Sequence, residues 1–177
     1  MKWMIVIIIV ILLLCIFIYN RFVRLNMRCK NAWAQIDNQL KRRADLIPNL
    51  VEVTKSYAEY ESTTLQKLIE ARNQAQTVEE VSKNASEMTK TLNRLFALTE
   101  NYPDLKANEL FKNLQVELTG TEDKIAFARQ FYNDCVQVFN NAIMVFPNNI
   151  LAKIFHYQEK EYFQIEQSER ENIKVKL

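Results

Sequence analysis

The sequence of 177 residues has very little glycine or histidine, since Gly120 and His156 are the single examples of each. Dinucleotide-binding and phosphate-binding loops need several glycines, because their backbones turn tightly and approach the ligand closely. Zinc sites of the HExxH type and the di-iron sites of helical bundles need at least two histidines. These classes of site are therefore excluded. No catalytic constellation is visible, so we predict that the chain is not an enzyme and holds no metal or cofactor.

Cysteine and net charge are also low. Cys15, Cys29 and Cys135 are an odd number of cysteines without the spacing of a disulfide framework, and we expect them to be ordinary thiols. The formal net charge is only +2, and no basic motif is present. Nucleic-acid binding needs clustered positive charge, so we predict no nucleic-acid partner. No small-molecule substrate is inferred either.

The chain does contain one long hydrophobic run, because all 17 residues from Trp3 to Tyr19 are apolar. At about 1.5 Å per residue a helix of this length covers roughly 25 Å, and Phe22 and Val23 extend it towards the hydrocarbon core of about 30 Å. We predict a short tail at residues 1–2 and a transmembrane helix at residues 3–23, surrounded by the lipid bilayer. The residues expected at the membrane interface are Trp3, Tyr19, Arg21, Arg24 and Arg28.

The same run could instead be a cleaved signal peptide or a lipoprotein signal that ends at Cys15. A cleavage site needs small residues, and residues 12–28 contain no Ala, Gly or Ser. Leu14 also stands where a lipoprotein signal needs a small residue. A retained anchor in the cell membrane is therefore favoured.

The charges beside the run favour one orientation. Only Lys2 and the terminal amine precede it, whereas Arg21, Arg24, Arg28 and Lys30 follow it. Loops rich in Lys and Arg stay in the cytoplasm. We expect a single-pass protein with an extracytoplasmic N-terminus and a cytoplasmic C-terminal part.

Helical periodicity dominates the rest of the chain. A first stripe with spacings of three and four runs from Trp33 through Ile47 and Thr54 to Ala58, and continues weakly to Ile69. Pro48 falls inside this stripe, and we expect a bend near it more than a break. No window shows the alternation of a strand. The sequence therefore predicts an all-α fold, in which a transmembrane helix precedes an antiparallel bundle of three to four long helices.

Several residues are expected to mark helix ends. Thr77 and Glu80 resemble a capping box before a second stripe, which runs from Met88 to Tyr102 and continues past Pro103 to Leu118. Pro103 and Asp104 indicate a restart, and Gly120 followed by Thr121 indicates a pause before a third stripe at residues 125–142. Pro147 ends that stripe, and a short helix is expected at residues 150–155. The residues expected in the core include Phe96, Phe127, Phe131, Tyr132 and Phe139.

The sequence also resembles a known family. The segments that carry the resemblance are Asn31–Asp37, Gln39–Arg43, Asp45–Glu52, Glu100–Ala107, Thr121–Ala126 and the pair Phe146 and Pro147. In this order they are similar to the pattern of the bacterial LemA family, over nearly the whole chain. The resemblance implies one N-terminal membrane helix, a proposed extracytoplasmic N-terminus, a four-helix bundle and a molecular function that is undefined. We accordingly expect a LemA-like helical bundle at residues 24–158 and a charged C-terminal tail at residues 159–177.

This chain departs from the family pattern at His156, where glycine is usual. Ala44 and Tyr60 stand where the family often has histidine. A histidine chemistry shared by the family is therefore disfavoured. We expect His156 to be a partly buried ring with one hydrogen bond and not a ligand.

A polar block on the first helix is the candidate surface for a partner. Asn38, Arg42, Arg43 and Asn49 look too polar for a core and lie close to Pro48. They could bind a partner helix or an acidic group. The alternative, which we favour, is that they belong to a solvated helix face, where Lys41 pairs with Asp37 and Asp45 at a spacing of four.

Two functions remain open. The first is a membrane-anchored helical-bundle protein that acts as an interaction or scaffold module, with a protein partner of unknown identity. The second is a membrane-tethered enzyme that uses carboxylates or a metal. We favour the first, because the membrane helix and the long helical stripes are present and a catalytic constellation is not.

Overall fold

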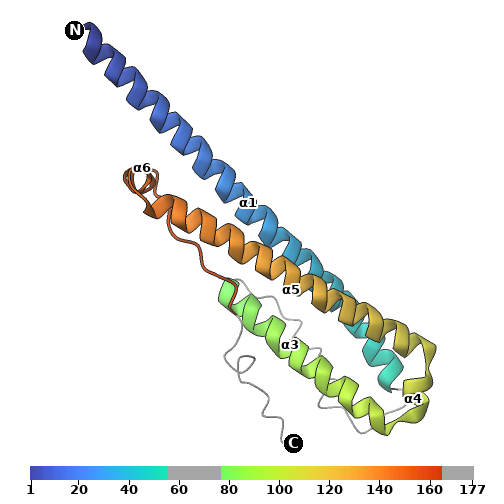
Figure 1. Ribbon diagram of the computed structural model, residues 1–177. Helices are drawn as coiled ribbons and strands as arrows, with labels where there is room; N and C mark the ends of the chain where they lie inside the picture. Colours follow the sequence, from blue (N-terminus) through green and yellow to red (C-terminus); the bar gives the residue numbers. More distant parts are fainter. Residues whose placement is uncertain (56–76, 165–177) are drawn as a thin grey trace, which may run out of the picture. The chain divides into compact units, whose positions relative to one another are not determined.

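The structure is a computed structural model that describes residues 1–55 and 77–164 (Figure 1). Within these residues every regular element is a helix, which confirms the all-α class. In chain order the elements are α1 (Lys2–Lys55), α3 (Val78–Leu98), the 3-10 helix η1 (Thr99–Asn101), α4 (Pro103–Ala107), α5 (Glu109–Met144) and α6 (Asn148–Ile154). The expected continuation of the first stripe from Ala58 to Ile69 lies outside the described residues.

The chain divides into two compact units. Unit 1 consists of residues 1–35 and 128–162, and unit 2 consists of residues 36–127 and 163–177. Helices α1 and α5 are long enough to contribute to both units.

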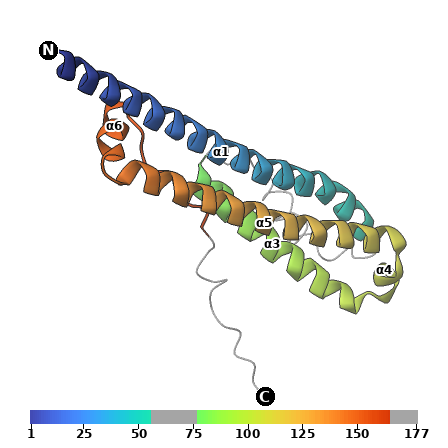
Figure 2. The same cartoon turned by 45° about the horizontal axis from the view of Figure 1, so that its top comes forward.

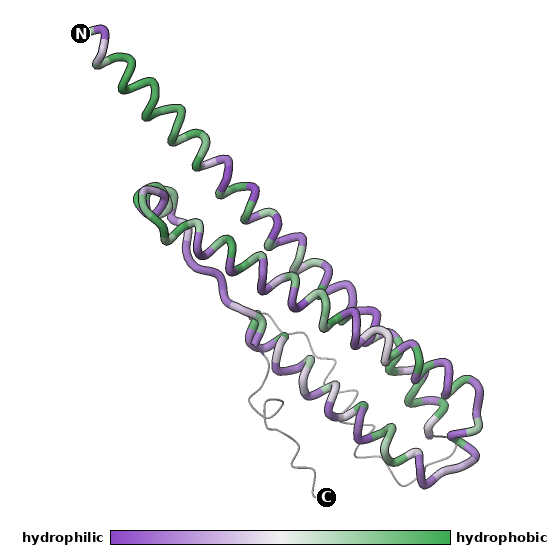
Figure 3. The backbone as a smooth tube through the Cα atoms, viewed as in Figure 1, coloured by the Kyte–Doolittle hydropathy of each residue, from purple (hydrophilic) through white to green (hydrophobic). Residues whose placement is uncertain are grey.

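Helix α1 begins at Lys2 and contains the whole hydrophobic run (Figure 3). It is the one helix among the described residues that is long and apolar enough to cross a membrane. The side chains of the run are exposed, as Trp3 at 83% and Phe17 at 61% illustrate. A soluble core helix would bury such side chains, so their exposure fits a lipid surrounding.

The same helix passes through Pro48 without ending. Proline removes one backbone donor, and that loss is smaller than the gain from burying a long apolar face. Of the residues in the predicted stripe, Ile36, Ile47, Val51 and Thr54 are buried. The expectation that the helix would not break at Pro48 is thus confirmed.

Aromatic contacts hold unit 1 together. The rings of Trp33 and Tyr132 lie 5.3 Å apart, and those of Phe22 and Tyr157 also lie 5.3 Å apart. Phe139 packs edge-on against Tyr157 at 6.0 Å. Phe22 precedes Trp33 in α1, whereas Phe139, which shares the partner Tyr157 with Phe22, follows Tyr132 in α5. Helices α1 and α5 therefore run antiparallel in this unit.

A separate apolar core fills unit 2. It combines residues of α1, α3, α4 and α5, namely Ile47, Leu50, Val51, Met88, Leu92, Leu95, Leu105, Phe111 and Leu118. The predicted second stripe, from Met88 to Leu118, supplies the last six of these residues. Thr77 and Glu80 form the predicted capping box at the start of α3, and Pro103 begins α4 as expected.

Gly120 does not interrupt a helix, contrary to the prediction. Helix α5 continues from Glu109 to Met144, and the Thr121 hydroxyl donates to the carbonyl of Glu117 four residues earlier. A single interior glycine costs a helix only about 1 kcal/mol relative to alanine. The burial of Leu118 and Ile125 on either side of it outweighs this cost.

The chain reverses after α6 through a left-handed residue, His156, with φ of 56°. Its N–H donates to the carbonyl of Lys153, and the N–H of Tyr157 donates to the carbonyl of Ala152 at 2.9 Å. These two bonds define a Schellman cap, in which the position of His156 normally favours glycine. His156 is exposed, so the prediction of a partly buried ring was wrong.

Two of the aromatic residues expected in the core were also placed wrongly. Phe127 is 73% exposed and Phe131 is 47% exposed, whereas Tyr132 and Phe139 are buried as predicted. On a helix each step turns the side chain by about 100°, so Phe131 faces outward when Tyr132 faces inward.

Candidate functional site

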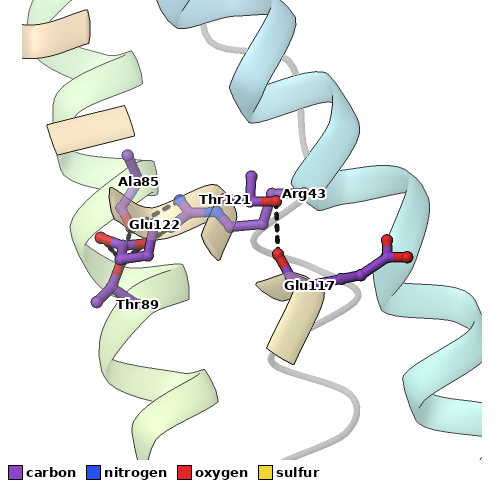
Figure 4. Close-up of polar contacts among 6 residues, drawn as sticks. All are labelled: Arg43, Ala85, Thr89, Glu117, Thr121 and Glu122. Carbon is purple, nitrogen blue, oxygen red and sulfur yellow. Dashed lines mark hydrogen bonds and ion pairs between the residues drawn. The ribbon is translucent and has the colours of Figure 1, made fainter. Parts of the chain in front are cut away.

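Arg43 is the centre of a polar network inside unit 2 (Figure 4). Its side chain is 1% exposed, and one guanidinium nitrogen, Nη1, donates to Glu122 and to the Thr89 hydroxyl, the latter at 2.9 Å. The other, Nη2, donates to the carbonyl of Ala85 at 3.0 Å. Burial lowers the pKa of Arg43, and the carboxylate of Glu122 opposes that shift.

Arg43 therefore belongs neither to the predicted partner surface nor to the solvated face that we favoured, so both predictions were wrong for this residue. Arg42 is exposed, and Arg43 follows it one residue later on the helix. A turn of about 100° per residue carries Arg43 into the core, where Glu122 and Thr89 satisfy its charge. The network joins α1, α3 and α5 and is a structural element of the unit.

The other three residues of the predicted surface stay on one exposed face of α1. Asn38, Arg42 and Asn49 are all exposed, at spacings of four and seven residues. Arg42 lies 3.9 Å from Glu117 of α5, and both side chains are about half exposed. The structure thus places this face of α1 next to α5 in unit 2.

An open groove lies beside this face, with a volume of about 680 Å³. Helix α1 contributes Leu46, Asn49, Glu52 and Val53 to its lining. The remaining lining residues are Asn108, Leu110, Asn113, Leu114 and Glu117. Of the predicted surface residues, Asn49 lines the groove and Asn38 does not. Arg42 does not line it either, but it forms an ion pair with the lining residue Glu117.

The groove combines an aliphatic surface with amide and carboxylate groups. Oδ1 of Asn108 accepts from the N–H groups of Leu110 and Phe111 at 2.8 and 3.1 Å, at the start of α5. The amides of Asn49 and Asn113 each have one acceptor and two donor hydrogens, which suits the backbone or amide groups of a polypeptide. Glu52 and Glu117 supply the carboxylates, and Arg42 pairs with Glu117. Such a lining can bind an amphipathic segment but has no nucleophile and base arranged for catalysis.

The lining residues of α5 were missed at the sequence level. Leu110, Asn113, Leu114 and Glu117 have spacings of three and four, so they share a helix face. The sequence shows this spacing on its own. It does not show that this face of α5 lies near Asn49, because the two segments are far apart along the chain.

The predicted membrane-interface residues are all exposed. Trp3 lies at the start of the hydrophobic run, and Tyr19 lies at its end, where its ring is 4.8 Å from that of Phe155. Arg21, Arg24 and Arg28 follow, and Nε of Arg24 donates to the carbonyl of Asn20 at 3.2 Å. These positions suit cationic side chains that reach lipid headgroups.

The described residues contain no group of three or more His, Cys, Asp or Glu side chains that could hold a metal ion. The three cysteines are free thiols. Burial raises the pKa of both Cys29 and Cys135. Their thiolate fraction at neutral pH is therefore small, which is typical of unreactive cysteines.

The chain is similar to known proteins of two names, MamQ and LemA. Magnetosome protein MamQ 2 of Paramagnetospirillum magneticum is 25% identical over 175 residues, covering 82% of this chain and 64% of its own length. Protein LemA of Metamycoplasma hominis is 26% identical over 161 residues, covering 87% of this chain and 72% of its own length. The chain thus spans less than two thirds of its MamQ relative.

The family comparison covers most of the chain. The profile of the LemA family matches residues 32–177, which include the whole groove lining and the Arg43 network. The match begins after the hydrophobic run. The chain belongs to the LemA family.

Proposed function

We propose that this protein is a single-pass membrane protein whose helical part binds a protein partner in the groove of unit 2. The observation that carries the proposal is the groove itself. Two helix faces, one from α1 and one from α5, leave aliphatic side chains and asparagine amides together at an open surface.

The lining indicates the kind of partner. Leu46, Val53 and Leu114 are partly buried against the core of unit 2, and Leu110 is 65% exposed. Together they line the groove as an apolar strip suited to one face of an amphipathic helix. The amides of Asn49 and Asn113 lie beside this strip and suit polar groups at the edge of that face. We therefore propose that the occupant is an amphipathic helix.

The membrane helix supports the location of this module. Its run of exposed apolar side chains favours a retained anchor, and the basic residues after it favour a cytoplasmic C-terminal part. We propose this orientation, with the N-terminus outside the cytoplasm. The groove would then meet partners at the cytoplasmic surface of the membrane.

Site-specific photo-cross-linking in intact membranes tests the groove. A photoreactive phenylalanine is placed at Asn49 or Asn113 in the groove, and at Val116 as a control. Val116 is 71% exposed on the same helix as Asn113 but does not line the groove. We expect one identified protein to be captured from both groove positions and not from Val116.

A second variant makes the result specific. Leu110→Asp places a charge on the apolar strip and should abolish capture from Asn49, whereas Val116→Asp should not. Leu110 is 65% exposed, so the charge does not enter the core of unit 2, and Val116 is similarly exposed at 71%. A synthetic helix from the captured protein should bind the full chain, and its binding should weaken with Leu110→Asp. Equal capture from all three positions, or capture that Leu110→Asp leaves unchanged, would overturn the proposal.

The rival function is a membrane-tethered enzyme that uses carboxylates or a metal. It predicts that a divalent cation raises the melting temperature of the purified chain, because a ligand that binds only the folded state stabilises it. A cation-dependent rise that Glu52→Gln or Glu117→Gln removes would favour the enzyme. An unchanged melting temperature across the divalent cations would favour the interaction module.

A further inference from the structure

The end of unit 1 that contains α6 exposes many apolar side chains. Six large ones are exposed between the last turn of α5 and the residue after α6: Met144, Val145, Phe146, Ile150, Ile154 and Phe155. Phe146 is 79% exposed and Ile154 is 60% exposed. We call residues 144–155 the apolar tip. A contiguous group of this kind usually marks an interaction site.

Helix α6 buries a polar residue and exposes two large apolar ones. Its buried residues are Asn148 and Ala152, while Ile150 and Ile154 face outward. The buried amide is satisfied, because Nδ2 of Asn148 donates to the carbonyl of Ala142 at 2.9 Å. In water the exposure of the Ile150 and Ile154 side chains is unfavourable.

The apolar tip lies at the end of the hydrophobic run of α1. The ring of Phe155 lies 4.8 Å from that of Tyr19, the last residue of the run, and Tyr157 packs on Phe22. Figures 1 and 2 both show α6 beside this part of α1. Any membrane that surrounds residues 3–23 therefore ends at the level of the apolar tip.

The charges around the apolar tip suit a lipid surface. Residues 135–158 contain no Asp or Glu, and residues 1–36 contain none either. Lys153 is exposed on α6, and Arg21 and Arg24 are exposed on α1. Cationic side chains beside apolar ones are typical of elements that lie in the membrane interface and contact anionic headgroups.

We propose that the apolar tip is a second membrane-contact site, which inserts its outward side chains into the boundary between headgroups and acyl chains. The occupant is the bilayer that α1 crosses, on the side where α1 leaves it. Insertion would cover Phe146, Ile150 and Ile154 with lipid and would tie unit 1 to the membrane at two points. The proposal rests on the anchor described under Proposed function.

Quenching of tryptophan fluorescence by brominated lipids tests the insertion. The full chain is reconstituted in phosphatidylcholine and phosphatidylglycerol vesicles in a Trp3→Phe background, in which Trp33 is constant. Phe146→Trp then reports on the apolar tip. Phe131→Trp is the matched control, because Phe131 is also an exposed phenylalanine of unit 1 but lies about 20 Å along α5 from the tip.

We expect lipids brominated near the headgroup to remove about half of the emission contributed by Phe146→Trp and little of that contributed by Phe131→Trp. Equal quenching of the two variants would overturn the proposal. A second outcome would also overturn it. If the emission from Phe146→Trp changed with the ratio of protein to lipid but not with bromine, the tip would contact a second copy of the chain and not the lipid. Trp3 in the unsubstituted chain reports on the anchor separately. If Trp3 is not quenched and the chain does not float with the vesicles, the anchor fails as well.

Discussion

Arg43 and Glu122 form an ion pair inside unit 2 although 79 residues separate them in the sequence. The guanidinium is almost fully buried, whereas Glu122 is 39% exposed. The pair connects α1 with α5, and Thr89 adds α3 through its hydroxyl, 3.1 Å from both carboxylate oxygens. Three helices are thus held in register by one buried cation.

Removing the charge of Glu122 should therefore destabilise the fold. Glu122→Gln leaves the guanidinium of Arg43 buried without a counter-charge, and we expect a loss of about 2 kcal/mol in the free energy of unfolding. Glu117→Gln is the control, since its pair with Arg42 is half exposed and worth less than about 1 kcal/mol. Chemical unfolding of the full chain in detergent, followed by circular dichroism, measures both. Equal losses would show that the Arg43 pair is no stronger than a surface pair.

Gly120→Ala should stabilise the protein. Gly120 lies inside α5, and a Cβ atom added there would have no neighbour within 4 Å. Alanine restricts the unfolded chain more than glycine does, so we expect a gain of about 0.5 to 1 kcal/mol in the same unfolding measurement. A loss of stability would mean that α5 needs a flexible joint at this position, as the sequence alone had led us to expect.

His156→Gly should also be stabilising. The φ of 56° at His156 is unfavourable for a residue with a Cβ atom, and glycine adopts it without strain. We expect the melting temperature to rise, corresponding to about 1 kcal/mol. His156→Ala is the matched control, because it removes the imidazole but keeps the Cβ atom. If alanine gave the same rise, the imidazole and not the backbone would be responsible.

Tyr132 should make stability fall at high pH. Its hydroxyl donates to the carbonyl of Glu161 at 3.0 Å, and burial raises the pKa of Tyr132 from 10.0 to about 12. Between these values the unfolded chain has lost a proton that the folded chain retains. The contribution is therefore fully present below pH 10 and is lost as the pH rises towards about 12.

Comparison of Tyr132→Phe with the unsubstituted chain isolates this effect. The difference in unfolding free energy should be constant up to about pH 10 and should then shift in favour of the variant. Phenolate absorbance should show one fewer late-titrating tyrosine in the variant. A difference that did not depend on pH would contradict the raised pKa.

The membrane orientation can be tested by labelling. Lys112 is exposed in unit 2, and Lys112→Cys should resist a membrane-impermeant maleimide in intact cells but react after permeabilisation. The unsubstituted chain is the control. Its Cys29 and Cys135 should react slowly, because burial raises their pKa and thiolate is the reactive form. Labelling of Lys112→Cys in intact cells would reverse the proposed topology.

Local features of the sequence predicted local structure well. Thr77 and Glu80 make a capping box from their own side chains and backbone, so no distant residue is needed to form it. The same applies to Pro103 at the start of α4 and to the hydrophobic run of residues 3–19. The spacing of the second stripe likewise predicted the burial of Met88, Leu92 and Leu95 in α3, but not that of Ser82, Ala85 and Ser86.

Position on a single helix face was harder to predict. Phe131 and Tyr132 are adjacent aromatics, yet one is exposed and the other is buried. Gly120 was expected to interrupt a helix, and the packing of its neighbours keeps α5 continuous. In each case the outcome depends on which neighbouring helix the side chains meet, and propensity carries no information about that.

The sequence by itself determined the helical class, the hydrophobic run of residues 3–19 and the starts of α3 and α4, because periodicity, hydrophobicity and capping act between residues close in the chain. The tertiary structure alone decided that Arg43 is buried while Arg42 is exposed, that Asn49 and Leu114 line one groove, and that Phe155 lies beside Tyr19. These relationships join residues that are distant along the chain. They are set by how helices pack and satisfy buried charge, so they exist only once the chain has folded.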